Sequence, residues 1–390
     1  MLPPLSRDER RQSEAVAQLI AAEIAAGAGW LSFERFMELA LYAPGLGYYS
    51  AGAFKIGAGG DFTTAPEVSA LFGRCLARQC AQVLRATRGD ILELGAGTGS
   101  LAAALLVELA TLGALPERYA ILEVSADLAA RQRERLAQLP AALRRRVVWL
   151  ERLPERALPG VILANEVADA LPCRRVRWGA DGLSEIGVSL ADAVDMPVGF
   201  REREVPAGPA LRGAWDDIVA GLPAPLPALY VSEVCLRVTA WIGALSACLE
   251  RGVLLLCDYG LPRRHYYHPQ RMSGTLRCHF RHRVHDDPYI NVGLQDITAW
   301  VDFTRVAEAG AAAGLTVSGF ATQTAFLLAL GIEEMVAAAP GDAARARFAV
   351  EAGQLLMPGE MGESFKALAL ARGFDEPLTG FALQDLRDSL

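Results

Sequence analysis

Glycines and carboxylates recur in this sequence where predicted strands end, which is where α/β sheets bind their ligands. The first such place is ILELGAGTGSL (91–101), where a predicted strand turns into a helix. It contains Glu93, Gly95, Gly97 and Gly99. Glycines there let the backbone turn sharply and let a ligand approach the main chain. A tight turn without a ligand is the alternative, but we predict that these four residues bind a cofactor.

The spacing of the glycines discriminates between cofactors. A dinucleotide fingerprint requires a glycine where this chain has Ser100, so a dehydrogenase is disfavoured. GxGxG after an acidic residue is instead typical of class I methyltransferases, which use S-adenosyl-L-methionine. The methionine part of that cofactor carries an ammonium and a sulfonium rather than a pyrophosphate. We therefore predict S-adenosyl-L-methionine as the cofactor and expect Glu93 to help neutralise its ammonium, directly or through water.

Carboxylates also follow the second and third predicted strands. Glu123 ends the strand YAILEV (119–124), roughly one βα unit after the glycines, where a carboxylate would hold both ribose hydroxyls. Ser125 follows it, is counted among the cofactor-binding residues, and is predicted to cap the next helix. Glu151, just after the third strand, could accept from the adenine amino group, although a surface position explains it nearly as well.

The fourth predicted strand runs directly into NEVADALP (165–172), which should face the transferable methyl group. Asn165 is assigned to the cofactor, and Glu166 and Asp169 are predicted to be catalytic. Methyl transfer needs positioning and removal of a proton from the acceptor, and two carboxylates can also hold a guanidinium bidentately. The alternative is that Asp169 caps a helix and Glu166 only orders the loop. Asp258, after the fifth strand, is either a supporting acid or a turn residue.

These residues need a parallel sheet to bring them together. From Asp90 onward, short β-like runs alternate with helical ones, which is the pattern of βαβ units. The predicted strands are 91–94, 119–124, 146–150, 160–165 and 252–258, with helices at 100–112 and 128–139. An insertion of roughly eighty-five residues separates the last two strands, far longer than an ordinary connection. We expect a hairpin in it that turns between Gly179 and Gly182.

The two ends of the chain are predicted to complete this core. Apolar residues recur at helical spacing in 13–26 and 33–41, which predicts an N-terminal helical cap. Thr64 and Glu67 have capping-box spacing, so a helix should start there. Near the C-terminus, the apolar segments LTVSGF and TAFLLAL are expected to close the sheet as an antiparallel pair.

Composition and charge narrow the functional classes. The chain of 390 residues is 52% hydrophobic and 21% charged, which is too apolar for a disordered protein. Its formal net charge of -7 disfavours nucleic acid as a partner. The apolar runs are too short to cross a bilayer, and the N-terminal residues lack the apolar core of a signal peptide. The seven scattered cysteines are expected to be reduced core residues of a cytoplasmic protein.

The chain as a whole resembles the MidA family of class I methyltransferases. The resemblance rests on FMELALYAPGLGYYS, GDFTTAPEVSALFG, LELGAGTGSL, ILEVSADL, ILANEVADALP, CDYG, SGTLRCHFRHRVHDDPYINVGLQDITAWVDFT and MPGEMGESFKALAL, in order over nearly the whole chain. The glycine motif alone indicates only the superfamily, whereas GDFTTAPEVS and QDITAWVDFT together are specific. One departure is Trp300, where the family is expected to have histidine; it affects no assigned role.

The resemblance implies a doubly wound α/β fold, with a Rossmann-like sheet of seven strands, a helical N-terminal cap and large insertions. The expected parts are a cap and cofactor lid (1–88), a core (89–330) with an insertion (172–250) and a substrate-side loop (259–300), and a C-terminal helical segment (331–390) packed on the core. The loop that contains Asp61, Thr63 and Thr64 is expected to close over the cofactor.

The resemblance also implies an acceptor. The mitochondrial member of the family dimethylates an arginine of a respiratory complex I subunit, so a protein arginine is expected here, with a subunit of a respiratory NADH dehydrogenase as the leading candidate. The richness in Ala, Leu and Arg indicates a bacterial protein, expected in the cytoplasm. No nucleic acid and no membrane insertion are expected, and the hydrophobic content is compatible with a homodimer.

The cluster of histidines raises the question of a metal site. All five histidines lie between His265 and His285, near Cys278, but they lack the paired spacing of a structural zinc site, so no metal is expected. A loop that covers the substrate is favoured there, with Tyr266, Tyr267, Arg271 and Arg277 at its surface.

Two further interpretations compete with a protein-modifying enzyme. A small-molecule methyltransferase would use the same cofactor half with a closed pocket, and the long insertion could either close such a pocket or dock a protein. A non-catalytic assembly factor would bind S-adenosyl-L-methionine only for stability. The presence of Glu93, Glu123, Glu166 and Asp169 argues against this second interpretation.

Overall fold

Parallel strands form the centre of the fold, as the alternating sequence pattern predicts. The computed structural model describes residues 2–51, 64–191 and 198–390. The main sheet has the strand order β15-β16-β10-β5-β2-β3-β4, and β14 also pairs with β10. Its strands are β2 (Asp90–Leu94), β3 (Tyr119–Leu122), β4 (Val147–Leu150), β5 (Leu158–Asn165), β10 (Leu249–Leu261), β14 (Val301–Asp302), β15 (Thr316–Thr322) and β16 (Phe365–Arg372). Among the described strands of this sheet, β16 alone runs in the direction opposite to all the others.

This strand order confirms the doubly wound α/β class. Seven strands form the continuous path and β14 adds an eighth, so the expected count of seven omits one short strand. The chain moves from β2 outward through β3 and β4, then returns to the other side of β2 with β5. The order therefore reverses beside β2, and the residues that follow β2, β3 and β5 meet at one edge of the sheet.

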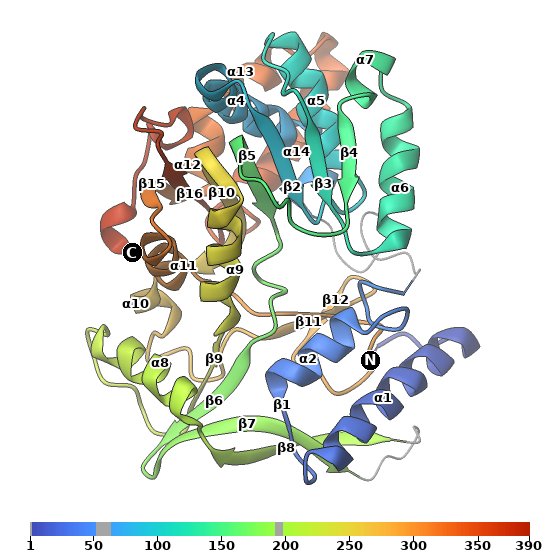
Figure 1. The fold of residues 1–390 in the computed structure, drawn as a ribbon, viewed down its shortest axis with the longest axis vertical. Helices are drawn as coiled ribbons and strands as arrows, with labels where there is room; N and C mark the ends of the chain where they lie inside the picture. Colours follow the sequence, from blue (N-terminus) through green and yellow to red (C-terminus); the bar gives the residue numbers. More distant parts are fainter. Residues whose placement is uncertain (1, 52–63, 192–197) are drawn as a thin grey trace.

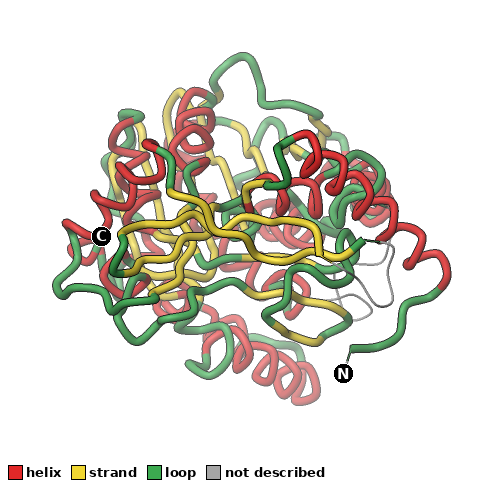
Figure 2. The backbone as a smooth tube through the Cα atoms, turned by 90° about the horizontal axis from the view of Figure 1, so that it is seen from below, coloured by secondary structure: helices red, strands yellow, loops and turns green. Residues whose placement is uncertain are grey.

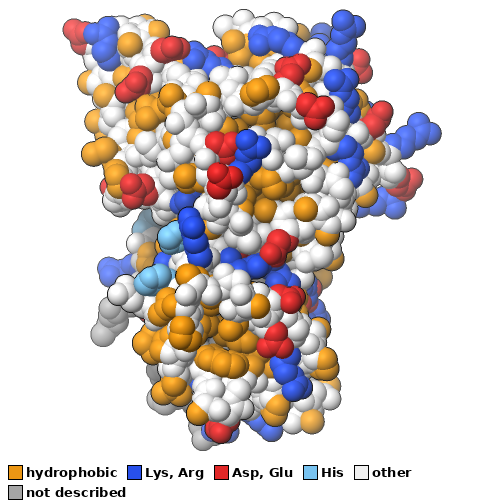
Figure 3. Space-filling view, turned by 90° about the vertical axis from the view of Figure 1, so that its left-hand side faces the viewer, with side chains coloured by type: hydrophobic (Ala, Val, Ile, Leu, Met, Phe, Trp, Pro, Cys, Tyr) orange, Lys and Arg blue, Asp and Glu red, His pale blue; other side chains and the backbone are white. Residues whose placement is uncertain are grey.

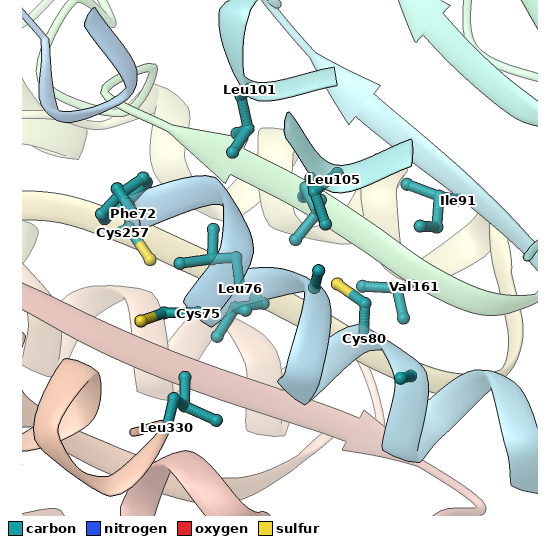
Figure 4. Close-up of a cluster of buried hydrophobic side chains, with 14 of the residues drawn as sticks. Phe72, Cys75, Leu76, Cys80, Ile91, Leu101, Leu105, Val161, Cys257 and Leu330 are labelled. Atoms are coloured by element: carbon teal, nitrogen blue, oxygen red, sulfur yellow. The ribbon is translucent and has the colours of Figure 1, made fainter. Parts of the chain in front are cut away.

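Helices cover both faces of the main sheet. Successive strand residues point to opposite faces, so Ile91 lies in one hydrophobic core and Leu92 in the other. Figure 4 shows the first core, where Cys75, Cys80 and Cys257 lie among Leu and Phe side chains. Its helices are α4 (Ala70–Thr87), α5 (Ser100–Thr111), α6 (Ala126–Ala137), α7 (Ala141–Arg144), α12 (Gln323–Ala329), α13 (Ile332–Ala337) and α14 (Gly341–Leu356). The second core is covered by α9 (Arg237–Ala247) and α11 (Phe303–Ala312).

A second lobe lies below the main sheet in Figure 1, built from the insertion and the N-terminal helices. Its sheet has the order β1-β7-β6-β9, with β8 also paired to β7, and Figure 2 shows its long strands from below. The predicted hairpin is confirmed, since β6 and β7 pair antiparallel up to Gly179 and Gly182. The elements are α1 (Arg7–Ala26), β1 (Leu31–Ser32), α2 (Phe33–Tyr42), β6 (Arg174–Gly179), β7 (Gly182–Ala191), β8 (Gly199–Pro206), α8 (Pro209–Ala220) and β9 (Tyr230–Val234).

The predicted boundaries between these parts need two corrections. The N-terminal part (1–88) is not all cap, because α4 packs in the core of the main sheet. The insertion (172–250) likewise ends with α9, whose Ile242 and Leu245 are buried against the other face of that sheet.

The single helix expected at Thr64 is two helices, α3 (Ala65–Val68) and α4, and the Thr64 side chain makes no capping hydrogen bond.

The C-terminal part differs most from the prediction. LTVSGF forms β15 as expected, but TAFLLAL forms the helix α12, because a short apolar run fits a buried helix as well as a strand. The antiparallel partner of β15 is β16, which lies between β10 and β15. The segment 331–390 is therefore not only helical: it supplies one of the inner strands of the core.

The substrate-side segment also has its own structure. It contains α10 (Arg263–Tyr266) and a three-stranded sheet of β11 (Arg277–Phe280), β12 (Arg283–His285) and β13 (Asp296–Thr298). The prediction that Tyr266 and Tyr267 lie at its surface is wrong, since both are buried. They pack with Trp215 of α8 in an apolar cluster, which is a better place for two adjacent aromatic rings than water.

Ion pairs tie the N-terminal helices to the rest of the molecule. Glu34 and Glu38 of α2 accept hydrogen bonds from Arg237 of α9, and Glu34 also pairs with Arg174 of β6. The Arg237 guanidinium lowers the pKa of Glu38 to about 2.

Six of the seven cysteines are buried and all are unpaired with one another. Among the described residues, no helix combines the length and apolar character that a membrane span requires.

The placement of β16 in the core can be tested by comparing two leucines of the C-terminal segment. Leu368 of β16 is fully buried, whereas Leu383 is 65% exposed. Leu368→Ala should lower the free energy of unfolding by about 3 kcal/mol, because it leaves a cavity in the core. Leu383→Ala should change it by less than about 0.5 kcal/mol. Denaturant unfolding of both variants measures the difference, and equal effects would contradict the core position of β16.

Candidate active site

The glycine loop after β2 has the geometry that its sequence predicts. Gly95, Gly97 and Gly99 have φ values of 58°, 54° and 85°, a conformation that side-chain-bearing residues rarely adopt. Gly95 and Gly97 line a cavity of about 310 Å³ at the carboxyl edge of the sheet. Gly99 begins α5 and faces Gln132 instead, so its role is to let the loop turn.

Glu93 lies at the base of this first cavity. It is 2% exposed, and its Oε2 accepts a hydrogen bond of 2.7 Å from the Tyr119 hydroxyl. Burial raises the pKa of Glu93 to about 7. A buried carboxyl group ionises much more readily beside a cation, because the nearby positive charge offsets the cost of ionising it away from water.

Glu123, after β3, also lines the first cavity and is held in place by two hydrogen bonds. Its Oε1 accepts from the backbone N–H of Ser125 at 2.8 Å, and its Oε2 accepts from Gln132 Nε2 at 2.9 Å. Gln132 Nε2 also donates to the carbonyl of Gly97, so one buried amide connects the ribose-binding candidate to the glycine loop. Ser125 caps α6 as predicted but does not line the cavity, which makes it a residue that orients Glu123.

The remaining predicted cofactor residues fall into three groups. Thr64 and Asn165 line the first cavity. Asp61 and Thr63 lie outside the described residues. Glu151 is exposed and does not line the cavity, whereas Leu153 nearby does, so the side of the cavity expected to hold an adenine is apolar rather than acidic.

Glu67 is a cavity residue that the sequence reasoning assigned only to helix capping. Its Oε1 accepts hydrogen bonds from the hydroxyls of Thr98 and Ser100, and its Oε2 lies 4.0 Å from Arg135. It therefore fastens α3 to the start of α5 beside the glycines. Capping-box spacing hides this role, because the same residue types serve both purposes.

The loop that follows β5 has an unusual backbone. Glu166 has φ 53°, in the left-handed region that non-glycine residues avoid, and its N–H donates to the carbonyl of Cys257. The backbone N–H groups of Val167, Ala168 and Asp169 all donate to Asp258 Oδ2, at 3.2, 2.9 and 3.3 Å. Asp258 is thus the supporting acid and not merely a turn residue: it holds the loop that carries both predicted catalytic groups.

A second cavity of about 280 Å³ lies against the first. Glu166 and Tyr49 line both cavities, so they stand where the two meet. Asp169 lines the second cavity, and its Oδ1 is buried without a hydrogen-bond partner among the described residues. Asp296 lines it too and accepts a 2.9 Å hydrogen bond from the Tyr49 hydroxyl. The remaining lining residues are Tyr259, Arg277, His279, Trp300, Ser364 and Phe365.

Three carboxyl groups therefore face one small space: Asp169 and Asp296, which are buried, and Glu166, which is partly exposed. Burial, reinforced by Asp169, raises the pKa of Glu166 to about 8. Burial also raises the pKa of Asp169 to about 6, and raises that of Asp258 behind it. Such a cluster favours a cationic occupant, because a cation lets the carboxylates ionise together.

Sequence reasoning missed Tyr49 and Asp296 because they come from distant segments. Tyr49 follows α2, and Asp296 begins β13. Tyr42 of α2 stacks on Tyr49 and donates to the carbonyl of Ala170. The N-terminal helices thus contribute to the site as well as covering it. Their only sequence signal was that they lie in segments shared with the family that the chain resembles.

Among the described residues, no cluster of His, Cys, Asp and Glu could hold a metal ion.

Comparisons with known proteins agree with this geometry. Residues 75–321 match a protein family described as "Putative S-adenosyl-L-methionine-dependent methyltransferase". A crystal structure of a Burkholderia thailandensis protein bound to S-adenosyl-homocysteine covers the whole of both chains, with 44% identity and a TM-score of 0.93. Two curated relatives are named protein arginine methyltransferase NDUFAF7, mitochondrial. The Danio rerio protein is 27% identical over 91% of this chain and 86% of its own, and the Homo sapiens protein 26% over 88% and 80%.

Cofactor binding should be lost when a side chain is added at Gly97. Gly97→Val places a branched side chain in the cavity, and we expect affinity for S-adenosyl-L-methionine to fall by about a hundredfold or more. Gly113→Val is the matched control: Gly113 has φ 62° and nothing within 4 Å of an added Cβ, so it carries the same backbone strain away from the site. Calorimetric titration of both variants checks this, and equal affinities would remove the loop from the binding site.

The raised pKa of Glu166 should appear in the pH dependence of stability. Below about pH 4.5 the group is protonated in both folded and unfolded chains; between that value and about 8 only the unfolded chain ionises. The free energy of unfolding should therefore fall as pH rises through this window. Glu166→Gln keeps an oxygen acceptor for the Ala65 N–H but removes the titration, so its stability should fall less between pH 5 and 8. If the wild type and the variant lose the same free energy of unfolding between pH 5 and 8, Glu166 has an ordinary pKa in the folded chain.

Proposed function

Since the chain belongs to the family of S-adenosyl-L-methionine-dependent methyltransferases, we propose that this methyltransferase modifies an arginine side chain of a protein. The observation that carries the proposal is the second cavity, where Glu166, Asp169 and Asp296 meet beside the cofactor cavity. The curated relatives named as protein arginine methyltransferases support the same acceptor.

The first cavity fits the cofactor in chemistry and in space. Carboxyl groups at Glu93 and Glu123 suit an ammonium and a ribose, respectively, and the glycines leave the main chain open to a ligand. The cavity volume of about 310 Å³ lies at the lower end of the range for small-molecule sites. When bound, S-adenosyl-L-methionine supplies an electrophilic methyl group on its sulfonium.

The second cavity fits a guanidinium better than an ammonium or a neutral group. A guanidinium is planar and cationic, and it binds carboxylates through paired N–H donors. Its flat faces can also stack on aromatic rings, and the walls include Tyr259, Trp300 and Phe365. A cavity of about 280 Å³ admits a side chain but not the main body of a protein substrate, so a long side chain is the part that enters.

Within this cavity, the residues of the chain have distinct roles. Glu166 stands at the junction of the cavities, so its carboxylate is placed to orient the reacting nitrogen and to accept its proton. Asp169 and Asp296 hold the rest of the guanidinium. Asp258 is a positioning residue, because it contacts the loop backbone and reaches the acceptor only through Glu166 and Asp169.

We further propose that the acceptor belongs to a subunit of a respiratory NADH dehydrogenase and that the enzyme acts in the cytoplasm. The target is supported by the resemblance to the family whose mitochondrial member modifies complex I. The compartment is supported by seven cysteines that are unpaired and mostly buried, as expected of a chain kept reduced.

Replacement of Glu166 tests its part in the reaction. Glu166→Gln should lower the turnover number by about a hundredfold to ten-thousandfold, the usual range for a lost acid–base group. Affinity for S-adenosyl-L-methionine should change by less than about threefold, because the substitution keeps the size of the side chain at the junction and leaves Glu93, Glu123 and the glycine loop unchanged. Glu155→Gln, which neutralises a 79% exposed side chain, is the control and should be fully active. Full turnover by Glu166→Gln would exclude the assigned role.

The acceptor can be identified with protein from a strain that lacks the gene. Soluble and membrane fractions are incubated with enzyme and S-adenosyl-L-methionine labelled in the methyl group, then hydrolysed for amino-acid analysis. We expect labelled methylarginine in a protein of the respiratory chain, and none with Glu166→Gln. Label confined to small molecules would instead support a small-molecule methyltransferase.

A further inference from the structure

The mouth of the second cavity is basic, although its interior is acidic. Arg277 and His279 of β11 line the cavity. Arg271 lies with its guanidinium 4.8 Å from the ring centroid of Trp300, which is another lining residue. The Arg277 side chain is 44% exposed, so its charge faces water as well as the cavity.

Two more basic side chains lie near these three. Burial lowers the pKa of His265 and of His279, so the positive charge comes mainly from Arg271, Arg277 and Lys366. Lys366 donates to the carbonyl of Ser364, which lines the cavity, and His265 lies within electrostatic reach of both Lys366 and Arg271. One nearby acid, Asp296, is the strand partner of His279 and belongs to the buried floor of the cavity. The other acids are exposed: Glu363 beside Lys366, and Asp286 at 3.6 Å from Arg277 with 81% of its side chain exposed.

The composition of the segment explains this local excess of positive charge. Residues 259–285 contain six arginines and all five histidines but no Asp or Glu, in a chain whose net charge is -7. Arg263 and Arg281 are paired within the molecule, to Glu308 and Glu9, so they do not contribute. Figure 3 shows histidines beside Lys and Arg side chains at the waist between the two lobes, and every histidine in that view belongs to this segment.

We propose that the rim formed by Arg271, Arg277 and His279, with His265 and Lys366 behind it, docks acidic residues that flank the acceptor arginine. This rests on the proposed function, since it assumes that an arginine enters the cavity. The acidic floor then binds the cation and the basic rim binds the carboxylates on either side of it, so the preferred substrate is an arginine within an acidic polypeptide segment.

The overall charge of the chain disfavours an acidic partner, and this gives the basic rim its purpose. A chain with a net charge of -7 repels an acidic protein at long range, so a local basic surface is needed to hold one. Arg277 lines the cavity itself, so its charge acts on a bound segment within the roughly 8 Å over which charges act at physiological ionic strength. Complementary charges at a rim mainly select the partner and orient its approach.

Fluorescein-labelled peptides with one central arginine test the docking. The arginine is flanked on both sides by glutamate, glutamine or lysine, and binding is measured by anisotropy in saturating S-adenosyl-homocysteine. The glutamate peptide should bind about tenfold more tightly than the glutamine peptide at low salt, with a smaller ratio at high salt. Arg277→Glu should lower the ratio to about threefold or less while the glutamine peptide still binds, which shows that the variant is folded. Arg156→Glu has the same charge change on an exposed residue just before β5 and should keep the wild-type ratio.

The outcomes separate this inference from the proposed function. Equal affinity for the three peptides, with binding that still requires the central arginine, would overturn the docking surface and leave the arginine acceptor standing. Binding that survives replacement of the central arginine by glutamine would overturn the acceptor itself. A short RNA that displaces the glutamate peptide at lower concentration than unlabelled peptide does would assign the basic rim to nucleic acid instead and refute the proposal.

Discussion

The carboxylate of Asp258 accepting three backbone N–H groups is the interaction on which the rest of the site depends. It holds residues 167–169 against the end of β10, and the turn this requires places Glu166 in the left-handed conformation. Without it, three N–H groups in a buried loop would lose their acceptor, at a cost of about 1–3 kcal/mol each. Because the loop is tied to the neighbouring strand, the Glu166 side chain reaches the junction of the two cavities.

The two cavities use burial in the same way for different ligands. Burial raises the pKa of Glu93 in the first cavity and of Glu166 at the junction with the second, and both would ionise most readily beside a cation. At neutral pH these buried carboxyl groups lower the stability of the folded chain when no cation is bound. Binding of a cationic group beside them is therefore favourable. The folded chain tolerates the cost because large hydrophobic cores cover both faces of the sheet.

The N-terminal helices and the substrate-side segment complete the site from outside the sheet. Tyr49 and Asp296 come from these two parts and meet through one hydrogen bond at the wall of the second cavity. The ion pairs from Glu34 and Glu38 to Arg237 of α9 fix α2, and therefore Tyr42 and Tyr49, relative to the main sheet. The pair between Glu34 and Arg174 ties α2 to β6 of the second lobe. The second cavity is thus assembled from pieces separated by hundreds of residues, whereas the glycine loop and the carboxylates of the first cavity come from consecutive strands.

The sequence by itself determined the cofactor half and the class of fold. Glycine spacing, a carboxylate at each strand end and the alternation of strand and helix are local signals, so Glu93, Gly97, Glu123 and Glu166 could be predicted as site residues from it, and all four line the first cavity. The tertiary structure alone decided that Gln132 links two of these residues and that Asp296 joins Glu166 and Asp169. It also decided that β16 is an inner strand, since a short apolar run does not reveal its partner. The physical reason is that strand pairing and the convergence of buried polar groups depend on contacts between distant segments, and a single sequence records the pieces but not which of them meet.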